Sequence, residues 1–203
     1  MFLFVGFIVV SACGPAPDSP QNSEATTASS DGVEQATHQD ALELERATDE
    51  QLAAYSQFFE DNKDAHLQQV AELVAFPTLA MIPENAPDLE KAGQYLVERI
   101  TEIGMENAAY HPAGGFPLVT AEWMQAEGQP TVVFYGHFDV QPVVPERWDS
   151  DPFNAEIRDN KMYGRGATDD KGYIIAFLST LEAMMKLDGG LPVNVKLFLD
   201  GSE

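Results

Sequence analysis

The sequence predicts an α/β fold, a three-layer α/β/α sandwich in which helices cover a central sheet. Three segments have the apolar patterns of strands: 117–123, 131–135 and 193–199. Three others have the spacing of helices: 49–75, 87–103 and 173–187. Because helical and strand segments follow one another along the chain, a sheet with helices on both faces is the expected packing.

The helical segments have recognisable ends. Segment 49–75 is expected to form two helices, broken near 61–64, and Phe76-Pro77 ends it because proline disfavours helix in the preceding residue. Gly104 is a plausible stop for 87–103, since glycine accepts the left-handed conformation that commonly follows a helix.

The strand segments differ in pattern. The run 131–135 is β-branched and aromatic throughout, which is typical of a strand buried on both faces. In 193–199 the apolar residues alternate, so they share one face. The turn sequence Ala-Glu-Gly-Gln-Pro separates 117–123 from 131–135, and these two strands are expected to pair.

Polar side chains follow these strands closely. His137 comes one glycine after 131–135, and Glu203 lies a few residues beyond 193–199. Asp169 sits in a glycine-rich turn just before the helical segment 173–187. Ligand sites of open α/β sheets lie outside the carboxyl ends of the strands, so we expect these three residues to converge there.

The residue types indicate metal-dependent hydrolysis. Imidazole and carboxylate groups bind Zn²⁺ and similar ions, and a metal pair lowers the pKa of a bound water to about 7. Asp139, two residues after His137, points to the same side of an extended chain and can accept the other imidazole N–H. Glu203 can take a proton from the water and pass it to the leaving amine.

Three stretches carry a family resemblance: Gly-His-Phe-Asp-Val-Gln-Pro at 136–142, the stretch Tyr-Gly-Arg-Gly-Ala-Thr-Asp-Asp-Lys-Gly at 163–172, and Leu-Phe-Leu-Asp-Gly-Ser-Glu at 197–203. They resemble motifs of the zinc metallopeptidase family that includes carnosinase-like dipeptidases, aminoacylases and succinyl-diaminopimelate desuccinylase, and most closely its dipeptidase branch.

The resemblance implies a role for each matching residue. His137 matches the histidine that binds one metal, Asp139 the aspartate that supports it, and Asp169 the aspartate that bridges two metals. Glu203 matches the general base of a Gly-x-Glu-Glu motif, and Glu is the residue expected at position 204. Asp139 and Glu203 are therefore the catalytic candidates, and His137 and Asp169 the metal ligands.

The resemblance also implies a cofactor, a substrate and an assembly. Zn²⁺ is the expected metal, two ions in a complete site, with Mn²⁺ or Co²⁺ as alternatives. A dipeptide or short peptide is the expected substrate, and a homodimer the expected full-length assembly. Relatives place further ligands and a dimerising lid later in the chain, so we expect an incomplete zinc-peptidase-like domain that hydrolyses little by itself.

Other interpretations fit parts of the pattern. Asp169 and Asp170 could simply begin a helix, where carboxylates favour the positive end of the dipole; the flanking motif favours metal binding for Asp169 and leaves Asp170 as the helix-start residue. Glu203 could be a solvated loop carboxylate. At the level of function, the alternatives are an N-acyl amino acid deacylase of the same family and a non-catalytic, surface-anchored binding protein.

The amino terminus predicts a location. Residues 1–13 resemble a lipoprotein-type signal: the apolar run 2–10 is too short to span a bilayer, and Cys13 closes a lipobox-like Val-Ser-Ala-Cys as the lipid attachment residue. Residues 14–48, rich in Pro, Ser and Thr, are expected to be a disordered tether, followed by the catalytic part at 49–203. We therefore expect membrane attachment through lipid in a bacterial cell envelope, on the periplasmic or extracellular side.

The charge excludes one class of partner. The chain has 33 Asp and Glu against 11 Lys and Arg, a formal net charge of −22. Nucleic acid binding needs a basic surface that replaces counterions, so no nucleic acid partner is expected.

Overall fold

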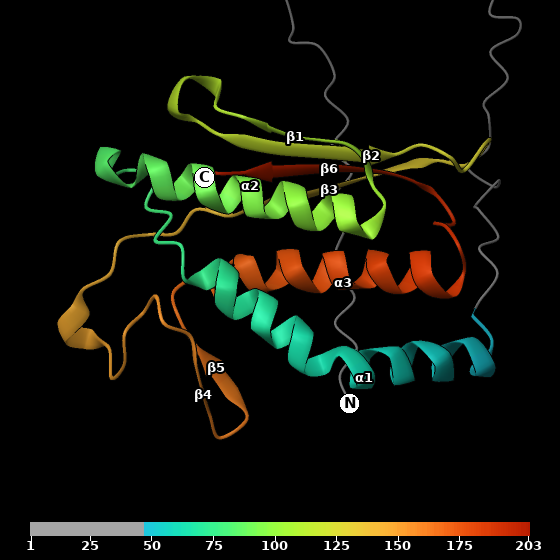
Figure 1. Cartoon of the computed structure of the whole chain (residues 1–203), viewed down its shortest axis with the longest axis horizontal. Helices are drawn as coiled ribbons and strands as arrows, with labels where there is room; N and C mark the ends of the chain where they lie inside the picture. The colour runs from blue at the N-terminus through green and yellow to red at the C-terminus, as the bar shows by residue number, and fades with distance from the viewer. Residues whose placement is uncertain (1–46) are drawn as a thin grey trace, which may run out of the picture. The chain divides into compact units, whose positions relative to one another are not determined.

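The computed structural model describes residues 47–203, which contain a four-stranded mixed sheet, a separate two-stranded sheet and three main helices (Figure 1). The helices are α1 (Asp49–Val74), α2 (Ala86–Ile103) and α3 (Lys171–Leu187), with 3₁₀ turns η1 (Pro83–Asn85), η2 (Ala113–Gly115) and η3 (Pro145–Arg147). The strands are β1 (Glu106–His111), β2 (Leu118–Trp123), β3 (Thr131–His137), β4 (Glu156–Arg158), β5 (Lys161–Tyr163) and β6 (Asn194–Asp200).

The predicted signal, with Cys13, and all but the end of the predicted tether lie outside the described residues. None of the helices in 47–203 combines the length and the apolar character needed to cross a membrane.

The main sheet has the strand order β1-β2-β6-β3, with β6 parallel to β3 and antiparallel to β2. The expected pairing of 117–123 with 131–135 is therefore wrong, because β6 lies between them. The connecting turn is held around the start of β6: the Asn194 side chain bonds to the backbone of Ala126 and Gln129. The turn between β2 and β3 therefore passes over the start of β6 instead of joining two neighbouring strands.

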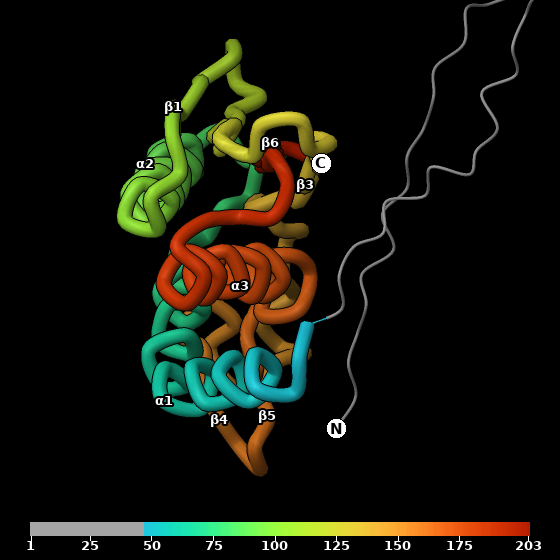
Figure 2. The backbone as a smooth tube through the Cα atoms, turned by 90° about the vertical axis from the view of Figure 1, so that its right-hand side faces the viewer, coloured from blue at the N-terminus to red at the C-terminus, as the bar shows by residue number. Residues whose placement is uncertain are grey.

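The helices in the described range pack on one side of the sheet (Figure 2). α2 contacts β1 and β2, α3 contacts β3, and α1 packs on α3 instead of on the sheet. The α/β class is thus confirmed, and residues 47–203 contribute the sheet and one helical face of the predicted sandwich.

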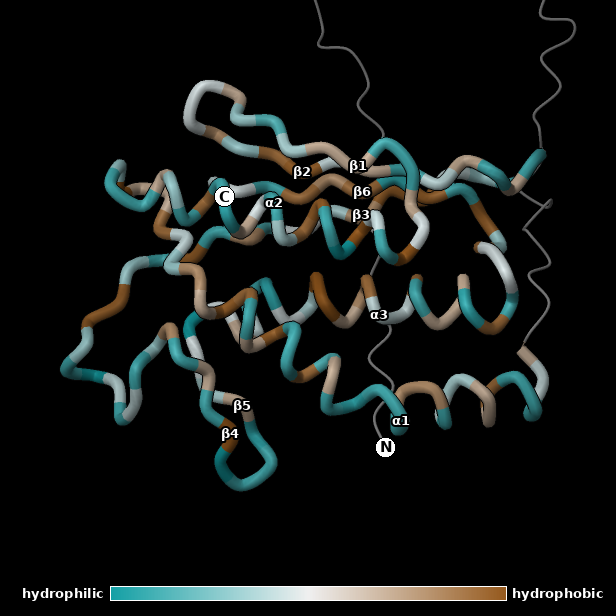
Figure 3. Tube along the Cα trace, viewed as in Figure 1, coloured by the Kyte–Doolittle hydropathy of each residue, from teal (hydrophilic) through white to brown (hydrophobic). Residues whose placement is uncertain are grey.

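The two faces of the sheet differ accordingly. Val195, Leu197 and Leu199 of β6 point into the core, as the alternating pattern predicts, and Figure 3 shows hydrophobic residues along β6 and α3. In contrast, Val133 and Tyr135 of β3 are 59% and 52% exposed. The prediction that 131–135 is buried on both faces is wrong for the described part of the chain, because its helices cover only the other face.

α1 is one unbroken helix of 26 residues. It begins with a capping box, in which Thr48 and Gln51 exchange side-chain to backbone hydrogen bonds. The predicted break at 61–64 is wrong: Asp61, Asn62 and Asp64 are weak helix formers, but the segment has no proline, and the Asn62 side chain donates to the Phe58 carbonyl inside the helix.

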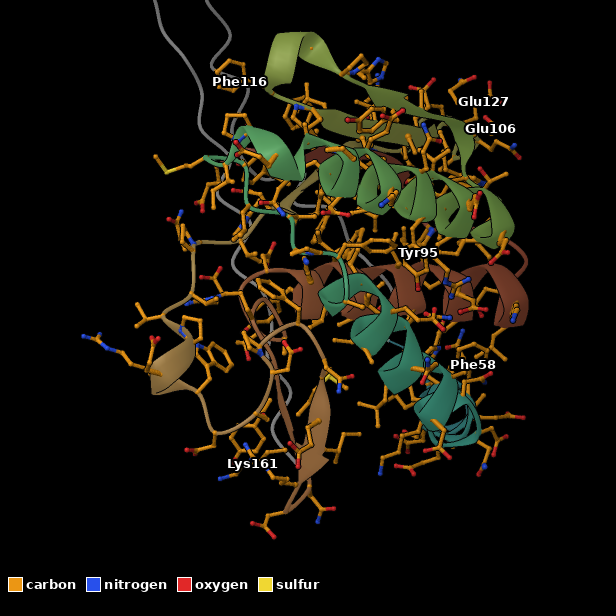
Figure 4. All side chains as sticks on the ribbon, turned by 60° about the vertical axis from the view of Figure 1, so that its left-hand side comes forward. Phe58, Tyr95, Glu106, Phe116, Glu127 and Lys161 are labelled. Carbon is orange, nitrogen blue, oxygen red and sulfur yellow. The ribbon has the colours of Figure 1, made fainter. Side chains whose placement is uncertain are left out.

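α2 ends as predicted at Gly104, whose φ of +98° is left-handed. Its middle is tied to α1 through Tyr95 (Figure 4), whose hydroxyl donates to Glu72 Oε2 at 3.0 Å. Burial, and after it the hydrogen bond to Glu72, raises the pKa of the Tyr95 phenol well above its ordinary value.

Two further features have weak sequence signals. β1 contains Asn-Ala-Ala, which lacks the β-branched residues typical of a strand, and it pairs with β2. The β4-β5 hairpin turns at Asp159 and Asn160, both with positive φ, a conformation that Asp and Asn tolerate better than most residues.

Candidate active site

The parallel strands β3 and β6 end at the same edge of the sheet. His137, the last residue of β3, is in register with Asp200, the last residue of β6, and the Phe138 N–H donates to the Asp200 carbonyl at 2.7 Å. Two residues that are 66 positions apart in sequence, His137 and Glu203, therefore leave the sheet side by side.

His137 faces two carboxylates through one ring nitrogen. Its Nε2 lies 3.1 Å from Asp169 Oδ1 and 3.5 Å from Glu203 Oε2. The His137 side chain is largely buried, whereas that of Asp169 is 90% exposed, so the aspartate lies on the solvent side of the imidazole. The structure thus brings together the three residues that the sequence analysis expects to converge: His137, Asp169 and Glu203.

Asp139 lies on the other side of the imidazole. It is buried, and its Oδ1 is 3.4 Å from His137 Nδ1; the same oxygen accepts the Glu203 backbone N–H at 3.1 Å. The Asp139 backbone carbonyl also lies 3.3 Å from Nδ1. With oxygens on the Nδ1 side, the imidazole is held so that Nε2 faces Asp169 and Glu203.

Asp170 stands at the start of α3, as expected, and its side chain has a further role. It occupies the N-cap position of α3, but its side chain makes no capping hydrogen bond. Its Oδ2 accepts the backbone N–H of His137 at 3.2 Å, across the interface between β3 and α3. A Cβ on Gly136 would lie 2.9 Å from this same oxygen, so the glycine of the Gly-His motif leaves room for the carboxylate.

Two glycines of the stretch 163–172, Gly166 and Gly172, stand where a side chain would clash with its neighbours. Gly166 has a φ of +87°, and a Cβ there would lie 2.8 Å from Val140. A Cβ on Gly172 would lie only 2.0 Å from the Ala167 carbonyl oxygen. The loop from 166 to 172, which carries Asp169 and includes a cis peptide bond between Asp169 and Asp170, is therefore folded tightly onto the start of α3.

The electrostatics of the cluster reflect burial and mutual charge. Burial by itself lowers the pKa of His137, but the Asp169 hydrogen bond and the nearby carboxylates raise it on balance. Burial raises the pKa of Asp139 and that of Asp170. Lys171, which sequence reasoning passes over, is fully buried, and burial lowers its pKa to about 7. Its only sequence signal is a lysine at the start of an apolar helix.

The atoms around His137 Nε2 are of the element types that bind divalent metals. An imidazole nitrogen and two carboxylate oxygens point toward one another, which is a nitrogen and oxygen set of the type that Zn²⁺ accepts. Across residues 47–203, however, no group of three or more His, Cys, Asp and Glu side chains is arranged as a complete metal site.

A small open pocket of about 250 Å³ borders Asp169. Its lining includes Trp148 and Arg165, and the Arg165 guanidinium lies 5.6 Å from the centre of the Trp148 ring. The pocket places open space next to the exposed carboxylate.

Residues 133–203 match the family described as peptidase family M20/M25/M40. The chain is 32% identical over 153 residues to the Cys-Gly metallodipeptidase dug1 of Schizosaccharomyces pombe, covering 70% of this chain and 32% of that protein. It is 43% identical over 102 residues to a succinyl-diaminopimelate desuccinylase of Thioalkalivibrio sulfidiphilus, covering 48% of this chain and 26% of that protein.

The solved structure of human carnosine dipeptidase 1 matches with a TM-score of 0.67 and 28% identity, over 77% of this chain and 35% of that one. The chain spans about a third of the length of the first curated relatives that it matches.

Proposed function

Because the chain belongs to peptidase family M20/M25/M40, we propose that its protein is a metal-dependent hydrolase of dipeptides or short peptides. The observation that carries the proposal is the convergence of His137, Asp169 and Glu203 within 3.5 Å of one imidazole nitrogen, from three separate motifs. A fold kept for packing alone has no need of two carboxylates around one histidine nitrogen.

In this proposal, His137 Nε2 and the Asp169 carboxylate hold the metal. When bound, Zn²⁺ supplies Lewis acidity for the carbonyl and for the attacking water. Asp139 positions the imidazole by accepting at Nδ1. Glu203 takes a proton from the water and delivers it to the amine that leaves, and its backbone bond to Asp139 places it at the histidine.

Peptide bond cleavage is supported by the similarity to a Cys-Gly metallodipeptidase and to a Beta-Ala-His dipeptidase. A second function is supported by the 43% identity to a succinyl-diaminopimelate desuccinylase. Both reactions hydrolyse an amide and need the same proton transfers at Glu203. The test compares the hydrolysis rates of Xaa-His dipeptides and of N-acyl amino acids by the longest protein that the gene encodes. Faster cleavage of the dipeptides supports peptidase activity. Faster cleavage of the N-acyl amino acids supports the deacylase.

We expect the 203-residue chain to bind Zn²⁺ weakly through His137 and Asp169 and to hydrolyse dipeptides little or not at all, because a catalytic zinc usually has three protein ligands. His137→Ala should weaken Zn²⁺ binding about tenfold or more in equilibrium dialysis. The matched control is His66→Ala, a histidine on α1 that faces Glu182 instead.

Equal Zn²⁺ affinity in the two histidine variants would contradict this metal site. Robust metal-dependent dipeptide hydrolysis by the 203 residues would contradict the expectation that ligands are missing.

We further propose that the protein is lipid-anchored at Cys13 on the outer side of a bacterial membrane, and that its full-length form is a homodimer. The apolar run and the Val-Ser-Ala-Cys sequence support the anchor. In bacteria supplied with labelled palmitate, the wild type should incorporate label and sediment with membranes, whereas Cys13→Ser should do neither. Label in the Cys13→Ser variant would contradict the assignment, and the sedimentation coefficient of the purified protein tests the dimer.

A further inference from the structure

Two buried polar side chains that have no role in the proposed catalysis, Thr78 and Lys171, form hydrogen bonds at the short segment 76–78. Thr78 and Lys171 are both 0% exposed, and both bond within or next to the segment 76–78 that leaves α1. A buried polar group is costly unless it is hydrogen-bonded, so the contacts of these two residues identify what they hold together.

Lys171 connects the loop 166–172, which carries the proposed ligand Asp169 and is named the metal loop, to the end of α1. Its Nζ donates to the Leu73 carbonyl at 3.0 Å and to the Phe76 carbonyl at 2.7 Å. α1 has no basic residue in its own last turn, and the amine of α3 adds a further donor to two carbonyls that each accept a backbone N–H. Lys171 is itself the first residue of α3, where the helix dipole disfavours a cation. Its position is thus explained by α1 and not by α3.

Thr78 connects the segment 76–78 to the backbone around Asp139, which belongs to the half of the site that carries His137. Its Oγ1 donates to the Phe138 carbonyl at 2.6 Å, and its own carbonyl accepts the Val140 N–H at 2.9 Å. Phe138 and Val140 are the two neighbours of Asp139 in the chain. Thr78 therefore holds the backbone on both sides of the residue that orients His137.

The segment 76–78 is continuous between these contacts. The Phe76 carbonyl that accepts from Lys171 also accepts the Thr78 N–H at 2.9 Å. Asp169, two residues before Lys171, and Asp139, between the two partners of Thr78, are in this way attached to one three-residue template. The direct bond from His137 N–H to Asp170 is a second connection between the same halves.

We propose that the segment 76–78 is the template that sets the spacing of the two halves of the metal site, with Lys171 and Thr78 as its positioning residues. The hydrogen bonds of both side chains go to backbone carbonyls and not to the proposed reacting atoms. The link to catalysis rests on the proposed function, but the mechanical coupling of the two halves does not.

Amide hydrogen exchange in the metal-free protein tests the coupling through its effect on the distant half. Lys171→Met should speed exchange at Val140, whose N–H bonds to Thr78, by about tenfold. Thr78→Val should speed exchange by a similar factor at Gly172, whose N–H closes the metal loop on Gly166. Thr78→Ser keeps the hydroxyl and should restore slow exchange at Gly172.

Asn194→Ala is the matched control. It also removes a buried, multiply bonded polar side chain, but at the opposite end of β6 from the site. This variant should lower the melting temperature. The ratio of the exchange rates at Val140 and Gly172 should stay the same as in the wild type. The template would be overturned if Lys171→Met left exchange at Val140 unchanged and Thr78→Val left exchange at Gly172 unchanged. It would also be overturned if both variants gave the same exchange result as Asn194→Ala.

The Zn²⁺ dissociation constant of the same variants tests the link to function. Lys171→Met and Thr78→Val should each raise it about tenfold, and Asn194→Ala should leave it unchanged. A wild-type protein that binds no Zn²⁺ refutes the proposed function, while the exchange result still decides on the template. Wild-type affinity for Zn²⁺ in both positioning variants refutes their role toward the metal.

Discussion

Replacing Glu203 with glutamine is expected to reduce kcat for dipeptide hydrolysis by about 10²- to 10⁴-fold in the longest encoded chain, because general acid–base catalysis contributes that much. Glutamine keeps the size of the side chain but cannot accept a proton from water. Its backbone N–H can still donate to Asp139, so the position of the chain around His137 should persist. Steady-state kinetics at saturating substrate measure the effect.

Zn²⁺ affinity separates this explanation from loss of the site. The Glu203→Gln variant should bind Zn²⁺ with the affinity of the wild type, since His137 and Asp169 are the proposed ligands. Retention of more than about a tenth of wild-type kcat would rule out Glu203 as the proton carrier. Loss of Zn²⁺ affinity along with kcat would make Glu203 a metal ligand instead.

Replacing Gly172 with alanine is expected to destabilise the protein by at least about 3 kcal/mol, at the upper end of the usual cost of overpacking. Gly172 lies inside α3, where alanine normally gains about 1 kcal/mol over glycine in helix propensity. Here the new Cβ would meet the Ala167 carbonyl oxygen at 2.0 Å, and the tightly folded backbone of the metal loop has no flexible end that can move away. The clash should outweigh the propensity.

Gly189→Ala is the matched control, at the other end of the same helix. Gly189 has a φ of +75° and open space around its Cα, so alanine there should cost only about 1 kcal/mol from backbone strain. Urea denaturation of both variants gives the two free energies of unfolding. If Gly172→Ala were no more destabilising than Gly189→Ala, the loop could not be as closely packed on α3 as the structure has it.

Much of the fold was accessible from residue patterns. Regular apolar spacing located α2, α3 and β6, because each buries one face against the same core and so shows its period in the sequence. The patterns did not predict burial correctly where it depends on which element packs against a strand. The run 131–135 is apolar enough for two buried faces, yet the described residues cover only one of them.

The strand order illustrates the same limit. A turn between two strand segments usually makes a hairpin, but here the Asn194 side chain engages the turn at 126 and 129 and β6 enters between β2 and β3. Asn194 lies 68 positions beyond Ala126 in the chain, so no local window contains both partners.

The roles of neighbouring acidic residues also depended on the assembled structure. Asp169 and Asp170 are adjacent and chemically identical, and the sequence favours one as a ligand only through the motif around it. In the folded chain, Asp169 faces the His137 ring and Asp170 bonds to the His137 backbone. That difference arises from the direction of each side chain at the junction of β3 and α3.

The order of residues alone determined which chemistry this chain can offer: a histidine and two acids, each placed directly after or before a regular element, since strand and helix periods and the spacing of glycines are local properties. Only the tertiary structure decided how those groups are held. Lys171 and Thr78 act through backbone carbonyls of distant residues, and a carbonyl is the same in every amino acid, so its partners leave no mark in the sequence.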